Sequence, residues 1–236
     1  MEIDFLTFVN ALMGDPILAL IVLLTLGATI VNGATDAPNA IATVVGTRAM
    51  KPGPAIAMAA VCNFIGLVGI TMVSSAVAHT IFGMVDFGGD NHAALVALAA
   101  AMVAIIVWGV AAWWFGIPTS ESHSLIAGLS GAAIAMHNGV DGINMQEWIK
   151  VIYGLVLSLA LGFAIGWIFC KLITIICANT DRRKANNFFQ GAQIFGAAAM
   201  SFMHGAQDGQ KFIGVLFLGV AFCNGQNSVS GMIIPV

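Results

Sequence analysis

The sequence predicts an all-α, polytopic membrane helix bundle with inverted-topology repeats, broken helices and a re-entrant hairpin. Of the 236 residues, 59% are hydrophobic and 8% are charged, whereas soluble domains carry about 25% charged residues. The mean hydropathy is +0.96, so lipid is the expected solvent for most of the surface. The repeats are indicated by one phrase that occurs twice in apolar sequence, as Gly33-Ala34-Thr35-Asp36 and as Gly205-Ala206-Gln207-Asp208.

Apolar runs long enough to cross a bilayer follow one another along the chain. The first extends from 17 to 47 and is interrupted by a polar stretch at 33–38. A second span is expected at 55–81, since about 20 residues cross the hydrocarbon core. The later segments are a span at 93–115, a polar interruption at 116–123, a shorter apolar stretch at 124–136, a span at 148–177 and a further apolar segment from Phe188.

Loop charges predict the orientation of these spans. The loops at 48–54 and 178–187 contain Lys and Arg, whereas the loop at 82–92 is acidic. By the positive-inside rule the basic loops are cytoplasmic, and the acidic loop and the N-terminus are outside. The stretch 93–136 then leaves and returns to the outer side, either as two full crossings or as a re-entrant hairpin with its tip near 116–122. The sequence does not choose between these alternatives.

With this orientation the two copies of the phrase run in opposite directions through the membrane. That is the inverted-repeat plan of secondary transporters, whose binding sites lie near the midplane. We expect residues 1–180 to form the first repeat and 188–236 to begin the second. The counterpart of the 116–122 hairpin would fall after Val236, so we expect a fragment lacking its last helices. A short natural form completed by dimerisation is the alternative.

The two aspartates of the phrase are the central candidates for a site, because an ionisable group in an apolar segment usually lines a path or a binding site. A helix opened between Gly33 and Pro38 frees N–H groups that favour an anion and carbonyls that favour a cation. The alternative is that Asp36 caps the half-helix that starts near Asn39. The recurrence of the phrase around Asp208 favours a site.

Three motifs carry a family resemblance. Residues 33–40 resemble the Gly-Ala-Asn-Asp-Val-Ala-Asn-Ala signature of the inorganic phosphate transporter (PiT) family, and residues 205–211 resemble its second copy. Residues 118–123 are similar to the Pro-Val-Ser-Thr-Thr-His hairpin motif of that family. The resemblance implies a bacterial low-affinity-type phosphate permease, a secondary active transporter that imports inorganic phosphate with a proton or sodium by alternating access.

The chain also departs from the family pattern. The first Asn of the signature is Thr35 in one copy and Gln207 in the other, and the second Asn is kept as Asn39 but becomes Lys211. A Thr of the hairpin becomes Glu121. The Lys211 ammonium can take the place of a bound sodium or neutralise phosphate directly. Because two buried charges are costly unless they pair, we expect Glu121 and Lys211 to approach each other or to share the ligand.

The candidate residues form two overlapping sets, one for the substrate and one for the coupling ion. We expect proton coupling through a buried carboxylate, with sodium at Asp36 and Asp208 as the alternative. His123 and His204 are each candidates for a proton relay or for a structural hydrogen bond. The expected substrate-binding residues are Asn39, Ser120, Ser122, Lys211, Asp36 and Asp208. The expected coupling-ion residues are Asp36, Asp208, Glu121, Thr35 and Gln207.

Other classes of function are disfavoured. We find no nucleophile–base pair, no HExxH motif and no metal-ligand spacing among the four cysteines, so we expect no enzyme, no catalytic residue and no cofactor beyond a coupling ion. No basic stripe for nucleic acid accompanies the net charge of −3. The expected partners are inorganic phosphate and the lipid bilayer, and a homodimer is kept open. The alternatives within transport are a permease for another oxyanion such as sulfate, and an anion channel.

Overall fold

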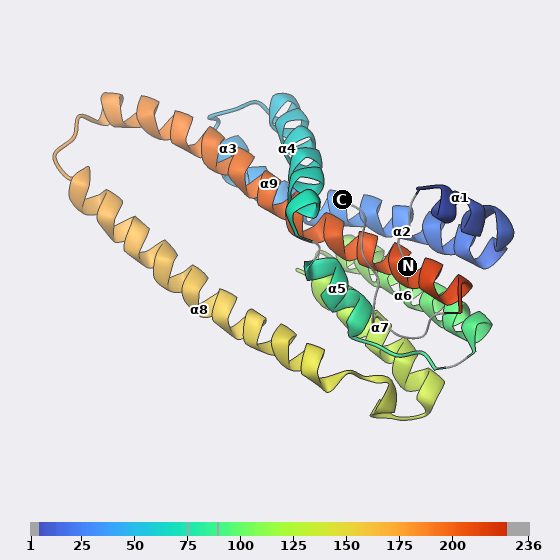
Figure 1. The fold of residues 1–236 in the computed structure, drawn as a ribbon. Helices are drawn as coiled ribbons and strands as arrows, with labels where there is room; N and C mark the ends of the chain where they lie inside the picture. The colour runs from blue at the N-terminus through green and yellow to red at the C-terminus, as the bar shows by residue number, and fades with distance from the viewer. Residues whose placement is uncertain (1–4, 75, 89, 226–236) are drawn as a thin grey trace.

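The computed structural model describes residues 5–74, 76–88 and 90–225, and these are almost entirely helical (Figure 1). The expected all-α class is confirmed, and the one pairing of extended backbone given for these residues is an isolated antiparallel bridge between Val85 and Ile143. The helices are α1 (Phe5–Gly14), α2 (Pro16–Thr35), α3 (Ala37–Gly46), α4 (Pro52–Val73), α5 (Ala76–Gly83), α6 (Asn91–Phe115), α7 (Glu121–His137), the 3₁₀ turn η1 (Val140–Gly142), α8 (Met145–Ile176) and α9 (Arg182–Cys223).

Polar side chains mark the beginnings of the long helices. The Asp15 carboxylate accepts the Ile17 N–H at 2.7 Å, and Pro16 occupies the first turn of α2. Asp90, Asn144 and Asp181 cap α6, α8 and α9 in the same way. A side-chain oxygen at this position satisfies a backbone N–H that the helix itself cannot pair. These caps place the observed helix starts within a few residues of the ends that hydropathy predicts.

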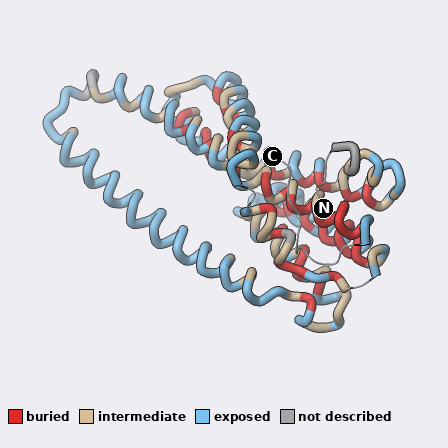
Figure 2. Tube along the Cα trace, viewed as in Figure 1, coloured by how far each residue is buried: buried red, intermediate tan, exposed pale blue. Residues whose placement is uncertain are grey.

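Several helices are suited to a membrane. Among the described residues, four segments are long and apolar enough to cross one: Pro16–Gly46, Pro52–Val73, Asn91–Phe115 and Met145–Ile176. None of the 32 residues of α8 is buried, although its side chains are mostly apolar (Figure 2). Exposed apolar side chains over a whole helix are stable in lipid and not in water. The expected multi-pass membrane bundle is confirmed.

The first interruption is narrower than the sequence predicts. Asp36 alone separates α2 from α3. Within 33–38, residues 33–35 belong to α2 and residues 37–38 belong to α3. The second copy of the phrase lies inside the unbroken helix α9, so the repeat of the phrase does not bring a second break at this place. The physical reason is the residue two positions after the aspartate. It is Pro38, which lacks an N–H, in the first copy and Gln210, which keeps one, in the second.

A break that the sequence analysis missed divides the span expected at 55–81. Helix α4 ends at Val73, and Ser74 has extended backbone with φ −156° and ψ 131°. The Ser74 carbonyl, which no following turn of α4 can pair, accepts the side-chain N–H of Gln210 at 2.7 Å. Gln210 is 1% exposed. Helix α9 therefore satisfies the backbone that the break opens.

The broken helix α2–α3 lies antiparallel to α9. The Asp15 carboxylate before α2 accepts a hydrogen bond from the Cys223 thiol at the end of α9, and Thr47 after α3 donates to Gln193 near its beginning. The two copies of the phrase therefore run in opposite directions, as an inverted repeat requires. The boundaries 1–180 and 188–236 stay a prediction, and residues 1–4 and 226–236 lie outside the described part.

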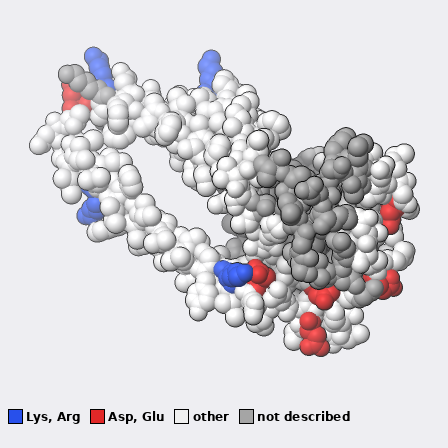
Figure 3. All heavy atoms as spheres, viewed as in Figure 1, with Lys and Arg blue, Asp and Glu red and all other residues white. Residues whose placement is uncertain are grey.

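The loops gather at two ends of the molecule. The turns after α3 and after α8 lie at one end, where Lys and Arg side chains are visible (Figure 3). The opposite end holds residues 84–88 and η1, which are joined by a hydrogen bond from the Asp86 N–H to the Gly142 carbonyl at 2.8 Å. Acidic side chains are concentrated there on the face shown in Figure 3. The basic and acidic loops thus lie on opposite sides, as the loop charges predict.

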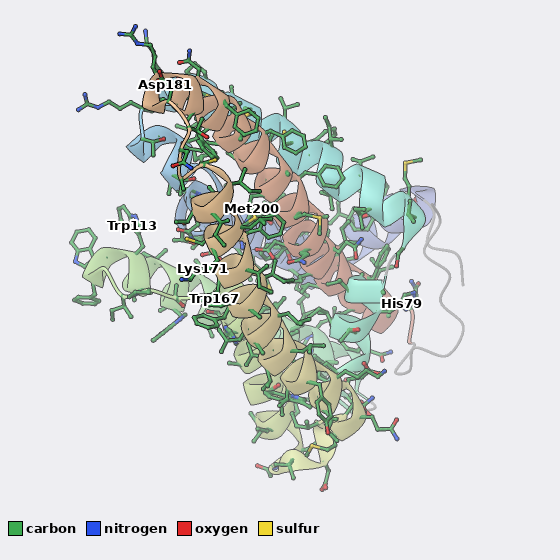
Figure 4. The ribbon with its side chains drawn as sticks, turned by 90° about the vertical axis from the view of Figure 1, so that its left-hand side faces the viewer. His79, Trp113, Trp167, Lys171, Asp181 and Met200 are labelled. Carbon is green, nitrogen blue, oxygen red and sulfur yellow. The ribbon has the colours of Figure 1, made fainter. Side chains whose placement is uncertain are left out.

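Helices α6 and α7 form a helical hairpin, and its short second arm favours the re-entrant alternative of the two that the sequence allowed. α7 has 17 residues, at the lower limit of the roughly 17–25 that cross a bilayer. The tip between the two helices meets the interior of the Pro16–Gly46 segment, because the Glu121 N–H donates to Asp36 at 3.3 Å. Figure 4 shows the Trp113 end of α6 stopping well short of the end marked by Asp181.

Helices α4 and α9 cross with their backbones in contact. A Cβ atom built on Gly66 of α4 would overlap the carbonyl oxygen of Phe202, and one built on Gly205 of α9 would overlap the carbonyl oxygen of Asn63. Small residues allow this approach in membrane helices, where packing rather than the hydrophobic effect holds helices together. The first glycine of the second phrase is thus needed for helix packing.

We predict that Gly66→Ala destabilises the protein by about 1–3 kcal/mol, because the added methyl group meets backbone that cannot move independently. Gly69→Ala, on the same helix with no atom within 4 Å of the added carbon, is the matched control and should unfold like the wild type. Thermal unfolding in detergent measures both. Equal midpoints for the two variants would contradict the close crossing.

Candidate functional site

The polar residues of the membrane interior meet where three elements converge. The end of α2, the beginning of α7 and the middle of α9 each contribute side chains, although they are far apart in the sequence. A network of hydrogen bonds and an ion pair joins the three elements. Its side-chain members are Asn32, Asp36, Ser122, Asp208 and Lys211; Glu121 takes part through its backbone N–H, and His204 lies beside Asp208.

Asp208 is the most heavily contacted member. Its Oδ2 accepts the side-chain N–H of Asn32 at 2.9 Å, and its Oδ1 pairs with the Lys211 ammonium. The Nε2 atom of His204, one turn earlier on α9, lies 3.3 Å from Oδ2. The Asp208 side chain is 14% exposed. The carboxylate is therefore held by the Lys211 cation of its own helix and by the Asn32 amide of α2, which offsets the cost of burying its charge.

Lys211 connects α9 to the tip of the hairpin. Its ammonium donates both to the Asp208 carboxylate, three residues earlier on the same helix, and to the hydroxyl of Ser122 in the first turn of α7. Residues three apart on a helix are neighbours on one face, so the spacing of Asp208 and Lys211 makes this pair possible. The bond to Asp208 joins two charged groups and is of the strongest kind in proteins, and the bond to Ser122 joins α9 to α7.

Asp36 interacts with the beginning of α7. Its carboxylate accepts the N–H of Glu121, the first residue of α7, at 3.3 Å. The same carboxylate makes no capping bond to α3, so the alternative in which Asp36 caps its own half-helix is wrong. The N-terminus of a helix favours negative charge. The break in α2–α3 therefore serves to direct a carboxylate at the hairpin.

Glu121 has a buried and unpartnered carboxyl group. The residue is 3% exposed, and neither carboxyl oxygen has a hydrogen-bond partner among the described residues. A Cβ built on Gly109 of α6 would lie 3.6 Å from one of these oxygens, so the side chain points toward α6. The expected pair with Lys211 is not formed, because the ammonium binds the neighbouring Ser122 instead. That Glu121 and Lys211 share a ligand stays a prediction.

The other predicted residues lie around the network without joining it. The Thr35 hydroxyl donates to the Val31 carbonyl of its own helix at 2.9 Å. Ser120 precedes α7, and its side chain makes no capping bond. Asn39 and Gln207 are exposed. The structure thus brings together five of the predicted residues, Asp36, Glu121, Ser122, Asp208 and Lys211, and leaves four at the margin.

Three amide residues escaped the sequence analysis. Asn32 is 4% exposed and binds Asp208, and Gln210 closes the break at Ser74. The side-chain oxygen Oδ1 of Asn63, on α4, accepts a hydrogen bond from Nδ1–H of His204 at 2.6 Å, and the Asn63 side-chain N–H donates to the Ala59 carbonyl. A single amide in an otherwise apolar span was the available signal.

A cavity of about 350 Å³ lies beside this network, between the broken helix α2–α3, α4 and α9. Asn32, Asn63, His204 and Asp208 contribute its polar groups, and side chains such as Phe64 form apolar walls. An apolar cavity with a few convergent polar groups is typical of a site for a small ligand. The cavity reaches the Asp208 side of the network.

Comparison with known proteins identifies the family. Residues 32–235 match the model of the phosphate transporter family. The chain belongs to this family. A probable low-affinity inorganic phosphate transporter of Bacillus subtilis (strain 168) is 36% identical over 205 residues, which are 87% of this chain and 60% of that protein. The low-affinity inorganic phosphate transporter PitB of Escherichia coli (strain K12) is 33% identical over 213 residues, 80% of this chain and 42% of that protein.

Two further comparisons bear on length and fold. A probable low-affinity inorganic phosphate transporter of Streptomyces halstedii is 36% identical over 82% of this chain, which corresponds to 91% of that protein. The chain spans less than two thirds of the Bacillus relative and less than half of the Escherichia relative. A solved structure, "The sodium-dependent phosphate transporter", superposes with a TM-score of 0.74 at 20% identity, over 94% of this chain and 71% of that one. This likeness confirms the fold of a phosphate transporter family member.

We predict that Asn32→Ala destabilises the folded protein by about 1–3 kcal/mol, because it leaves one oxygen of the buried Asp208 carboxylate short of a donor. Asn39→Ala is the matched control, since Asn39 is exposed and no side-chain hydrogen bond is recorded for it within the described residues. Thermal unfolding in detergent compares the two. If Asn39→Ala lowers the unfolding midpoint as much as Asn32→Ala does, the Asn32–Asp208 bond between α2 and α9 does not stabilise the fold.

Proposed function

We propose that the protein imports inorganic phosphate together with a coupling cation, by exposing the Asp36–Asp208 network alternately to the two sides of the membrane. The observation that carries this proposal is the Lys211 ammonium held between Asp208 and Ser122 inside the bundle. The ammonium has three N–H donors, of which two are taken by Asp208 and Ser122, so an anion can accept the third while Asp208 stays paired. The names of the relatives, which are inorganic phosphate transporters, support phosphate as that anion.

The beginning of α7 offers the remaining features of an anion site. A helix N-terminus and the adjacent hydroxyls of Ser120 and Ser122 can donate to phosphate oxygens. Asn39 lies on α3 within the same region of the fold and adds an amide. Capping and ligand binding use the same end of a helix, so the two roles of Ser120 are compatible. Lys211 provides the charge, and the serines orient the tetrahedral anion.

The carboxylates require a cation when phosphate binds. Asp36, Asp208 and Glu121 would repel an anion unless a positive charge or a proton lies between them. Glu121 is the preferred proton carrier, because a buried carboxylate without hydrogen bonds is costly in its charged form. Sodium at Asp36 and Asp208 is the alternative, since the protein of similar fold is named as sodium-dependent.

The orientation follows from the loop charges. We place the loops at 48–54 and 178–187 in the cytoplasm and the acidic end, with the N-terminus, outside. The hairpin α6–α7 then enters from the outer side, and its tip meets the network from that direction. Alternating access would move the hairpin and α9 relative to each other about the Lys211 contacts.

We predict that purified protein in liposomes accumulates phosphate when a pH gradient is imposed without sodium. Glu121→Gln should reduce this gradient-driven uptake by about 5–150-fold, the range of typical coupling energies, because an amide cannot carry the proton. Counterflow of phosphate without a gradient should persist in the variant. Uptake that requires sodium and ignores the pH gradient would overturn proton coupling.

A permease for another oxyanion is the second candidate, and the acidic side chains discriminate against sulfate. At neutral pH phosphate and arsenate carry an O–H group that can donate a hydrogen bond to a carboxylate, whereas sulfate has hydrogen-bond acceptors only. We therefore predict that excess arsenate competes with labelled phosphate for uptake and that excess sulfate does not. Equal inhibition by sulfate would favour a less selective oxyanion permease.

A further inference from the structure

The two halves of the site differ in one decisive residue. Each copy of the phrase places a polar side chain three residues after its aspartate, which on a helix is a neighbouring position. In the first copy the pair is Asp36 and Asn39, and in the second it is Asp208 and Lys211. One aspartate therefore has a neutral amide beside it, and the other has a permanent cation.

The Lys211 ammonium occupies the position that a small cation would take beside Asp208. It contacts a carboxylate oxygen and a hydroxyl oxygen, Asp208 Oδ1 and Ser122 Oγ, and both are ligands that hard cations prefer. The second carboxylate oxygen is bound by Asn32 at 2.9 Å and faces His204 at 3.3 Å. Both oxygens of the Asp208 carboxylate thus have partners, and its charge is already neutralised by Lys211. Asp208 therefore does not require an additional cation.

Asp36 lacks such compensation. In the part of the chain that the structure describes, it makes no ion pair, and its recorded partner is the N–H of Glu121 at 3.3 Å. The side chain of that same residue adds a second carboxyl group with both oxygens unpartnered. Bringing phosphate to this side of the network would add negative charge where no fixed cation balances it.

We propose that Lys211 is a built-in replacement for one mobile cation, so that a mobile coupling cation is needed on the Asp36–Glu121 side alone. This inference rests on the proposed function and specifies its stoichiometry. The protein moves one coupling cation fewer per phosphate than a transporter in which both aspartates lack a fixed partner. Lys211 thereby acts as a residue that determines coupling, in addition to contacting the anion.

Cation binding to the purified protein tests the inference without requiring transport. Thermal unfolding is followed in sodium chloride against choline chloride, and in choline at two pH values on either side of neutrality. In Lys211→Asn a new mobile cation should bind at Asp208 and, at about ten times its Kd, raise the midpoint by about 3–6 °C beyond the wild-type response. The double variant D208N/K211N should lose this gain, and Lys51→Asn, in an exposed loop, should respond like the wild type.

The reverse variant keeps the test decisive if K211N does not fold. Asn39 is exposed, so Asn39→Lys should fold, and its ammonium should replace the mobile cation at Asp36. The cation-dependent rise of the wild-type midpoint should then disappear. A K211N response equal to that of the wild type, or an undiminished response in N39K, would overturn the inference. If the wild type takes up no phosphate although these cation responses are observed, the proposed function alone is refuted.

Discussion

The structure depends on the ammonium of Lys211 lying between the carboxylate of Asp208 and the hydroxyl of Ser122. This group neutralises a buried charge on α9 and attaches α9 to the tip of the α6–α7 hairpin. Asn32 then attaches the same carboxylate to α2, and Asp36 attaches the end of α2 to the first residue of α7. Three elements that are distant in sequence thus form one closed polar network, and removing its cation would leave several acidic groups buried together.

Much of this arrangement could be predicted from the sequence. Hydropathy located the long apolar helices to within a few residues, except where they break, because the energetic cost of polar residues in lipid is large and depends little on tertiary detail. The recurrence of a phrase around Asp36 and Asp208 predicted that the two would take part in one polar centre, and they do, through intervening residues. The sequence left open a re-entrant hairpin with its tip near 116–122, and the contact between Asp36 and Glu121 places that tip against the break between α2 and α3.

The remaining features depend on contacts that a linear pattern does not contain. The break at Ser74 has no Gly or Pro beside it and exists because Gln210 of another helix pairs its carbonyl. α9 stays continuous because Gln210 stands where the first copy has Pro38. Glu121 was expected to meet Lys211, but the direction of the α7 backbone presents Ser122 to the ammonium and turns the Glu121 side chain toward α6. Whether a residue faces a partner or its own helix is a rotamer choice made by packing.

The central claim is that the Lys211 ammonium binds the transported anion directly while it stays paired with Asp208. Solid-state NMR on protein labelled with ¹⁵N-lysine and saturated with phosphate measures this directly, through the dipolar coupling between the lysine nitrogen and ³¹P. A charge-assisted contact predicts a nitrogen–phosphorus separation of about 4 Å, lost in K211N while the K51N control retains it. The account would be contradicted if phosphate binds but shows no nitrogen–phosphorus coupling that K211N abolishes, since the anion would then be held elsewhere.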